Sequence, residues 1–308
     1  MTQDNRSTRR FLQSTRALAF TLLLGLLYGT ITGCSTTAKL NSFAELSKAG
    51  IAYVDAANAV IAQAADGSIA ADTTTLVLSR ERLNRDLRIK GLTNQSDELA
   101  KQLDIFSDIR RHQGLVKEYF VSLGALANAG DADSAIGAAT SGTIAALGEL
   151  NKKFGGVKVG ELPLADFAAK ATPLIVANLR ARALEQELRT NGATMNRELL
   201  VSEGLMAFLA TKIRDDGRTV QNVREAKAVF APYVDQGPLP ADWAATRATF
   251  LRYSADLASV GAAQDAARKL RLALAAATED NLAPGQLQLL VTDLSNLVDI
   301  LEKVKRRP

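Results

Sequence analysis

NLAPGQLQLLVTDLSNLVDILEKVK, residues 281–305, carries the most regular apolar stripe in the chain. Its apolar residues recur every three or four positions, which places them along one face of an α-helix. They are Leu287, Leu290, Leu294, Leu297, Leu301 and Val304. Pro284 suits the first turn of a helix, and Lys303 and Lys305 suit its C-terminal end, where the helix dipole favours cations. We therefore expect an amphipathic helix whose stripe packs inside the monomer.

The same spacing of three or four continues through most of the chain toward the N-terminus. It is found from Phe43 to Ala64, from Leu99 to Ala127 and from Trp243 to Leu274. Aromatic residues make up only 5% of the sequence and prolines number seven, a composition that favours helices over strands. We expect an all-α fold, an elongated antiparallel bundle of about seven or eight helices without a strand pair.

Breaks between these helices are expected where glycine, proline and polar residues gather. The expected breaks lie at 66–68, 91, 128–133, 155–163, 191–192, 216–219 and 232–240. New helices should begin at Asp72 and Ser96, and another should run from near Asp166 to about Arg189. The segment 155–163 holds three glycines and a proline, so it is the best candidate for a boundary between two helical halves. Within it, Val157 and Val159 could form one isolated extended stretch.

The N-terminal segment has the three parts of a secretory signal. Four arginines precede an uncharged apolar stretch, Ala17 to Tyr28, which is followed by small residues and Cys34. The apolar stretch is shorter than the about 20 residues that a transmembrane helix needs. We therefore expect residues 1–33 to be a cleaved signal peptide, residues 34–41 to be a tether and residues 42–308 to be the helical domain.

Ile31-Thr32-Gly33-Cys34 resembles the lipobox of bacterial lipoprotein precursors, in which an aliphatic residue and two small residues precede the cysteine. The resemblance implies lipidation of the Cys34 thiol and cleavage before this residue. In such lipoproteins, a serine such as Ser35 after the cysteine implies the outer membrane, facing the periplasm. Thr8-Arg9-Arg10-Phe11-Leu12 also resembles part of a twin-arginine export signal, although the spacer before Phe11 is missing. The export route therefore stays open between the general and the twin-arginine pathways.

The charge of the chain is almost balanced once the leader is set aside. Of 37 basic and 33 acidic residues, the leader holds four arginines and Asp4, which leaves 33 basic and 32 acidic residues, a net charge of +1. This balance argues against nucleic acid as a partner and against a polybasic membrane-binding patch. Arg80, Arg82, Arg85 and Arg88 are nevertheless close in sequence. They could form a face for an anionic ligand, although mixed ion pairs on a solvated helix surface explain them as well.

No pattern of catalytic or cofactor-binding residues is found in the sequence, so no cofactor and no metal are expected. His112 is the only histidine and lies off the apolar seam, so we expect an exposed helical histidine and no multi-histidine metal site. Asp215-Asp216-Gly217 is interpreted as a turn, and Trp243 as a core residue. Phosphate-binding glycine loops of the GxxxxGK[ST] type and a nucleophile motif of the GxSxG type are missing.

Ser134 to Gly148 differs from the rest because it contains no charged residue and is rich in alanine, glycine, serine and threonine. It could insert into a membrane, but at 15 residues it is too short to span one as a helix. We favour a buried central helix of the bundle, where small residues allow close approach.

Three functions are compatible with the sequence. The leading one is an envelope-anchored, non-enzymatic lipoprotein that binds or scaffolds a protein partner, with segments 155–163 and 237–240 as the candidate contact surfaces because loops often carry recognition. The alternative is a membrane-active helical protein that inserts segment 134–148. An enzyme would require a pocket with converging polar residues that the sequence does not indicate.

Overall fold

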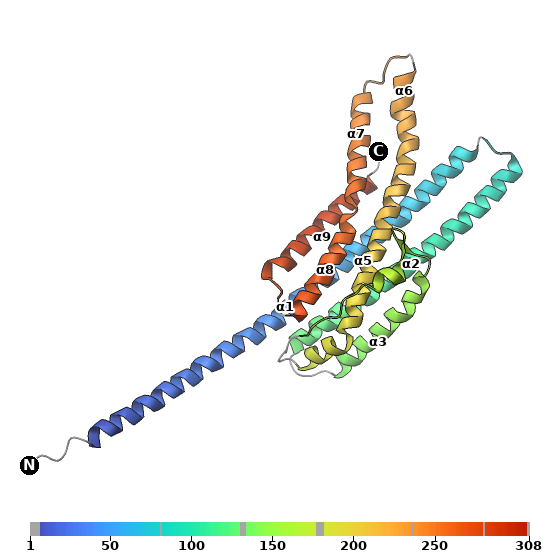
Figure 1. The fold of residues 1–308 in the computed structure, drawn as a ribbon. Coiled ribbons are helices and arrows are strands. Elements are labelled where there is room, and N and C mark those ends of the chain that lie inside the picture. The colour runs from blue at the N-terminus through green and yellow to red at the C-terminus, as the bar shows by residue number, and fades with distance from the viewer. Residues whose placement is uncertain are drawn as a thin grey trace, which may run out of the picture.

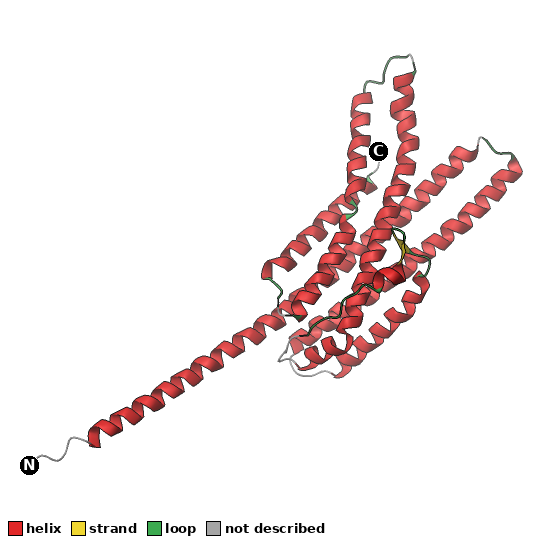
Figure 2. Ribbon diagram, viewed as in Figure 1, coloured by secondary structure: helices red, strands yellow, loops and turns green. Residues whose placement is uncertain are grey.

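The computed structural model describes residues 7–80, 82–129, 134–176, 182–235, 237–279 and 281–306. In these segments the chain is helical almost throughout (Figure 1, Figure 2). The helices are α1 (Ser7–Arg80), α2 (Arg85–Ala129), α3 (Ser134–Asn151), α4 (Leu164–Ala168), α5 (Arg182–Glu225), α6 (Ala231–Val234), α7 (Trp243–Ser259), α8 (Ala262–Thr278) and α9 (Pro284–Lys305). The predicted all-α fold is confirmed.

Helices α1 and α2 form a long antiparallel hairpin. Asn84 caps α2, because its Oδ1 accepts a hydrogen bond from the Leu87 N–H at 3.0 Å. Near the other end of the hairpin, the Ser47 hydroxyl donates to the Phe120 carbonyl oxygen at 2.6 Å. The helices approach closely at Gly50, where a Cβ atom would lie 2.3 Å from the Phe120 ring. Glycine is therefore required at this crossing.

Helix α5 runs parallel to α1. Ser202, in the middle of α5, lies beside Tyr53 of α1, and 14 residues further along α5, Asp216 accepts a hydrogen bond from Ser68. Two contacts that advance together along both helices establish the parallel direction. The C-terminal half of α5 consequently extends in the same direction as the C-terminal half of α1.

Helices α7 and α8 lie end to end and antiparallel to α5. The Gln221 amide donates to the Ser254 hydroxyl of α7 at 2.7 Å, and Arg271 of α8 pairs with Glu203 of α5 at 3.2 Å. The sequence predicted one helix over this region, and that prediction was wrong at Val260 and Gly261, where α7 ends and α8 begins. The apolar stripe nevertheless stays in phase across the break, because both helices pack on the same partner.

Helix α9 packs against α1, α7 and α8. All six residues of its predicted stripe are buried in the monomer, namely Leu287, Leu290, Leu294, Leu297, Leu301 and Val304. An ion pair between Lys269 and Asp293 joins α8 to α9 at the surface. The prediction that this stripe packs inside the monomer is therefore confirmed.

Four of the predicted helix breaks were wrong, because α1, α2 and α5 each run continuously through them. The breaks were those at 66–68, 91, 191–192 and 216–219. At three of them the glycine is buried, and at Gly217 a Cβ would lie 2.6 Å from Leu257 of α7. The threonines that follow Asp72 do not start a helix, since Thr73, Thr74 and Thr75 donate to carbonyls one turn earlier in α1.

A short 3₁₀ turn precedes the irregular segment 155–163, and the segment itself contains a small strand pair. The 3₁₀ turn is Lys152–Phe154, and strands β1 (Lys158–Val159) and β2 (Leu162–Pro163) pair antiparallel around Gly160, whose φ of +61° favours glycine. A strand pair had not been expected. The helix predicted from near Asp166 to Arg189 was also wrong, because α4 ends at Ala168 and α5 begins only at Arg182.

Helix α3 is an outer helix, whereas the sequence predicted a buried central one. Its Thr143, Leu147 and Leu150 are buried against neighbouring helices, while Ser141 and Ala145 are exposed. Small residues on the exposed face therefore do not mediate close helix approach. The membrane-insertion alternative for segment 134–148 remains a prediction. No helix in the described part of the chain combines the length and apolar character needed to cross a membrane.

The packed bundle ends before its longest helices do. Between Ala71 and Phe106 no described residue is buried, and between Gln221 and Phe250 only Val229 is. We call residues 72–105 the first arm and residues 222–249 the second arm. Both project beyond the bundle, at the end opposite the start of α1 (Figure 1).

Candidate functional site

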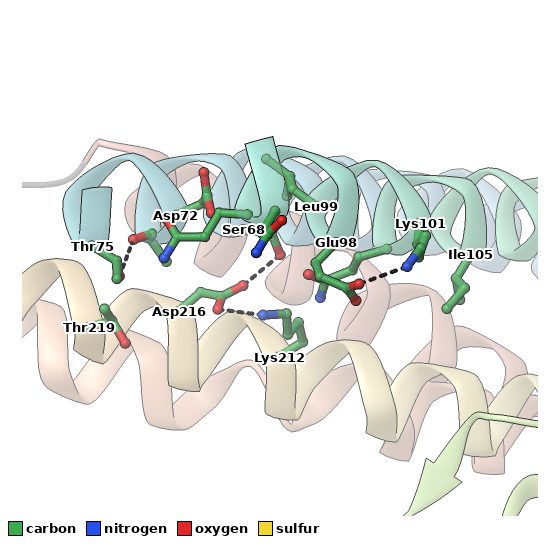
Figure 3. A pocket seen from close by; sticks show the side chains of 14 residues that line it. Ser68, Asp72, Thr75, Glu98, Leu99, Lys101, Ile105, Lys212, Asp216 and Thr219 are labelled. Carbon is green, nitrogen blue, oxygen red and sulfur yellow. Dashed lines mark hydrogen bonds and ion pairs between the residues drawn. The ribbon is translucent and has the colours of Figure 1, made fainter. Parts of the chain in front are cut away.

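A cleft lies at the base of the first arm, between α1, α2 and α5 (Figure 3). Its volume is about 620 Å³. Helices α1 and α2 supply its walls, and the part of α5 that leads into the second arm supplies the third side. Most of the residues that line it are polar or charged, namely Ser68, Asp72, Thr75, Asn94, Gln95, Glu98, Lys101, Gln102, Lys212, Asp216 and Thr219, while Ala71, Leu99 and Ile105 and the aliphatic parts of the longer side chains add apolar surface.

Asp216 ties two sides of the cleft together. Its Oδ2 accepts a hydrogen bond from the Ser68 hydroxyl at 2.6 Å, and its Oδ1 accepts one from the Lys212 ammonium group at 2.6 Å. Lys212 lies one turn before Asp216 on the same face of α5. Figure 3 shows these three side chains directed toward one another. The sequence interpretation of Asp215-Asp216-Gly217 as a turn was wrong, because Asp216 is a buried helical residue that holds α1 against α5.

The wall formed by α2 is more open to solvent. Glu98 and Lys101 form an ion pair at 2.7 Å, and the carboxylate of Glu98 raises the pKa of Lys101. Nearby, Gln95 Oε1 is shielded from solvent and has no hydrogen-bond partner among the described residues. The cleft therefore offers carboxamide, hydroxyl and charged groups of both signs. Such a surface can hydrogen-bond to a polypeptide.

A second polar cluster lies inside the bundle around His112. The sequence predicted an exposed histidine, and this was wrong, because the His112 side chain is fully buried. Its Nε2 lies 3.3 Å from Glu198 Oε2, and the Asn151 amide donates to both oxygens of the same carboxylate at 2.8 Å and 2.7 Å. The ring also contacts Phe154 edge-on, with the centroids 5.9 Å apart.

The His112 cluster joins helices α2, α3 and α5. Adjacent to it in sequence, the Gln113 amide donates to the Ser202 hydroxyl at 3.3 Å. The Glu198 carboxylate is contacted from both sides, by an imidazole of α2 and an amide of α3. These contacts fix the register of three helices, because a slip would leave the buried carboxylate unpaired. These residues are not part of the cleft lining. We therefore assign the cluster a structural role.

Three more buried polar side chains lie between α1, α2 and α5. Burial raises the pKa of the Tyr53 and Tyr119 phenols, which keeps both neutral. Burial also raises the pKa of the Glu187 carboxyl, and a hydrogen bond from the Asn191 amide opposes part of that effect. The neighbouring Glu187 carboxylate adds to the rise at Tyr119. These groups stabilise the protein best in their neutral forms.

The residues singled out in the sequence are not brought together by the fold. Cys34 lies within α1, as does the predicted tether 34–41, and the Cys34 side chain is outside those that the structure describes. Segment 155–163 packs on α5, where Val159 lies against Gly204, as does Leu164 at the start of α4. Trp243 was predicted to be core but is only partly buried in the second arm. Its indole donates to the Val229 carbonyl at 3.0 Å and its ring stacks on Tyr233.

The cleft residues could not be found from sequence, because they come from three segments with no shared motif. Among the described residues, no group of three or more histidine, cysteine, aspartate or glutamate side chains is placed to hold a metal ion. Comparison of the chain with protein-family models, with curated proteins and with solved structures found no match. The geometry of the cleft and the arms is therefore the basis for a functional proposal.

Proposed function

We propose that this protein is an envelope-anchored helical lipoprotein that acts as a non-enzymatic scaffold and holds a segment of a protein partner in the cleft. The observation that carries the proposal is the cleft itself, which α1, α2 and α5 line mostly with polar and charged residues at the point where the first arm leaves the bundle. Its lining follows about two turns of α1 and α5 and about three turns of α2. Its hydrogen-bonding groups suit a polypeptide, and the arms would flank a bound segment.

The anchor part of the proposal rests on the lipobox resemblance at Cys34. We place the lipid in the outer membrane with the helical domain facing the periplasm, because Ser35 follows the cysteine. Metabolic labelling with a fatty acid tests this directly. Wild-type protein should be labelled and shortened, whereas Cys34→Ala should be neither. Equal labelling of the two would contradict the anchor.

The partner part is tested by site-specific photo-cross-linking in the native envelope. A photo-cross-linking amino acid at Thr75 or Gln102, which line the cleft, should give a discrete cross-linked product. The matched control position is Lys152. This residue is exposed, begins the 3₁₀ turn after α3 and does not line the cleft. The charge reversals Asp72→Lys and Glu98→Lys, placed together in the cleft, should abolish the product. The same products from Thr75 and Lys152 would contradict a specific partner in the cleft.

The alternative, in which segment 134–148 inserts into a membrane, is less well supported. Insertion would remove Thr143, Leu147 and Leu150 from their buried contacts, and no feature of the structure compensates for that loss. Leakage of dye-loaded liposomes separates the two functions. A scaffold should cause none, whereas an inserting protein should cause leakage that a charged substitution on α3, such as Ala145→Asp, prevents.

A further inference from the structure

The tip of the first arm combines exposed apolar and basic side chains. Five large aliphatic residues within 77–92 are exposed to solvent in the monomer: Val77, Leu78, Leu87, Ile89 and Leu92. Five cations lie among them, namely Arg80, Arg82, Arg85, Arg88 and Lys90, and all five are exposed. We call residues 77–92 the basic tip.

The basic tip has a higher net charge than the mature chain as a whole. Residues 77–92 contain five cations and two anions, Glu81 and Asp86, which gives a net charge of +3. The mature chain carries only +1 over 275 residues (308 − 33). A balanced composition had argued against a basic membrane-binding patch. The fold overturns that argument, because the turn after Arg80 gathers these cations at the end of one hairpin.

The tip of the second arm is aromatic and apolar. Phe230, Tyr233, Val234 and Leu239 are exposed there, and the Tyr233 ring stacks on Trp243 with centroids 5.5 Å apart. We call residues 230–243 the aromatic tip. Tyrosine and tryptophan rings with a polar edge suit the headgroup region of a bilayer, where one end of the side chain is apolar and the other meets water.

Both tips lie at the same end of the molecule. Because α1 and α5 are parallel, the first arm and the second arm leave the bundle in the same direction, away from Cys34 (Figure 1). Along α1, the rise from Cys34 to Arg80 is about 70 Å at 1.5 Å per residue. A protein anchored through Cys34 therefore presents the two tips far from the membrane that holds its lipid.

We propose that the basic tip and the aromatic tip together bind the surface of an anionic lipid bilayer, so that the protein tethers a second membrane to the one that carries its anchor. Cations beside exposed aliphatic side chains fit an interface with anionic headgroups above acyl chains. The apolar side chains at the tips are exposed at the ends of two hairpins, whereas the cleft lies further down the first arm. The inference requires the lipid anchor of the proposed function but not the partner in the cleft.

The test measures capture of one set of vesicles by another. Full-length lipidated protein is inserted into immobilised donor vesicles of phosphatidylcholine. Fluorescent acceptor vesicles contain phosphatidylcholine alone or mixed with phosphatidylglycerol. We expect capture of the anionic acceptors only, and we expect it to fall as salt is raised, because exposed charges are screened. Equal capture of neutral and anionic acceptors, or capture of neither, would overturn the proposal.

Matched variants assign the effect to the tips. Each cation near an anionic surface is worth roughly a fivefold gain in affinity, so Arg82→Gln with Arg85→Gln should weaken capture by about 25-fold. Lys48→Gln with Lys152→Gln removes the same charge from exposed positions on the bundle and should leave capture unchanged. Equal loss in both double variants would overturn the assignment to the basic tip. Circular dichroism confirms that each variant is folded.

The aromatic tip has its own variant. Phe230→Ser with Tyr233→Ser removes two exposed rings without touching the bundle core, and should weaken capture of anionic acceptors several-fold while leaving its salt dependence in place. Unchanged capture would overturn the role of the aromatic tip. The cross-linking at Thr75 is read separately, so failure of the partner in the cleft and failure of membrane tethering are distinguishable.

Discussion

Helices α1 and α2 run through both the bundle and the first arm, yet the contacts that stabilise them differ between the two regions. In the bundle, α1 and α2 are covered by α3, α5, α8 and α9, and residues such as Val54 and Val116 are fully buried. In the first arm, beyond the cleft where α5 lies alongside, the same helices have only each other, and no described residue of the arm is buried. Two helices cannot enclose a core, so order in the arm depends on continuity with the bundle. A surface of this kind is available for partners at little cost to stability.

The largest difference between the two regions is expected when a leucine is truncated. Leu294→Ala, at a side chain that is 4% exposed, should lower the free energy of unfolding by about 2–5 kcal/mol, because it leaves a cavity in the core. Leu92→Ala, at a first-arm side chain that is 54% exposed, should change it by less than about 0.5 kcal/mol. Denaturant unfolding followed by circular dichroism measures both.

The midpoint for the wild-type protein should not depend on protein concentration, since the α9 stripe is buried within one chain. A concentration-dependent midpoint would show that a second copy contributes to this core. Equal losses for Leu294→Ala and Leu92→Ala would instead show that the first arm is packed in solution.

A glycine in the bundle gives the next largest effect. Gly50→Ala would place a Cβ 2.3 Å from the Phe120 ring, so α1 and α2 must separate or the ring must move. The expected loss is about 1–3 kcal/mol of unfolding free energy, as for other overpacked cores. The double variant Gly50→Ala with Phe120→Leu should recover part of it, because a smaller side chain makes room. No recovery would mean that the loss arises from the backbone and not from the contact.

Glycines also show why the helix boundaries were harder to predict than the helices themselves. Apolar periodicity is local, so the stripes of α1, α2 and α9 were visible in the sequence. Whether a glycine ends a helix depends on what lies opposite it. Gly67, Gly192 and Gly217 are buried and stay helical. The predicted break at 232–240 is real only after Val234, where α6 ends, and Pro238 and Pro240, which cannot donate backbone hydrogen bonds, lie in it.

The candidate cleft and the buried His112 cluster could not be predicted from the sequence for the same reason. His112 stands between Arg111 and Gln113, so its neighbours in sequence suggest a solvent-exposed helix face. The partner that makes burial possible, Glu198, is 86 residues away. In the same way Asp216 meets Ser68 across 148 residues. Polar residues with distant partners leave no periodic signal, so sequence reasoning assigned them to surfaces and turns.

A pH-dependent effect is expected only in the bundle. Burial raises the pKa of Glu187 above its ordinary value, so folding favours the protonated carboxyl. The stabilisation is fully present below the ordinary pKa of a glutamate and is lost as the pH rises through the raised pKa of the folded state. Glu187→Gln keeps a neutral side chain of the same size. Its stability relative to wild type should therefore increase between about pH 4 and pH 7.

Unfolding midpoints of both proteins across that pH range check the expectation. The matched control is Glu98→Gln in the first arm, where the carboxylate is exposed. It should show no comparable rise with pH. A flat difference between wild type and Glu187→Gln would mean that the carboxyl is solvated in the folded protein.

The smallest expected effect has the opposite sign and belongs to the first arm. Gly91 lies inside α2, and a Cβ built on it meets no atom within 4 Å. Alanine fits this helical backbone and reduces the conformational freedom of the unfolded chain, so Gly91→Ala should raise the stability of the arm by about 0.4–1 kcal/mol. Because the arm has no core of its own, the gain should appear mainly as slower hydrogen exchange in residues 85–105.

Exchange in the bundle portion of α2, such as at Val116, should change far less, since those amides open only when the bundle opens. Gly50→Ala and Gly91→Ala are thus the same substitution in adjoining helices of one hairpin, with opposite expected signs. If Gly91→Ala slowed exchange equally in residues 85–105 and at Val116, the first arm would unfold together with the bundle. The distinction between the two regions would then be one of exposure and not of stability.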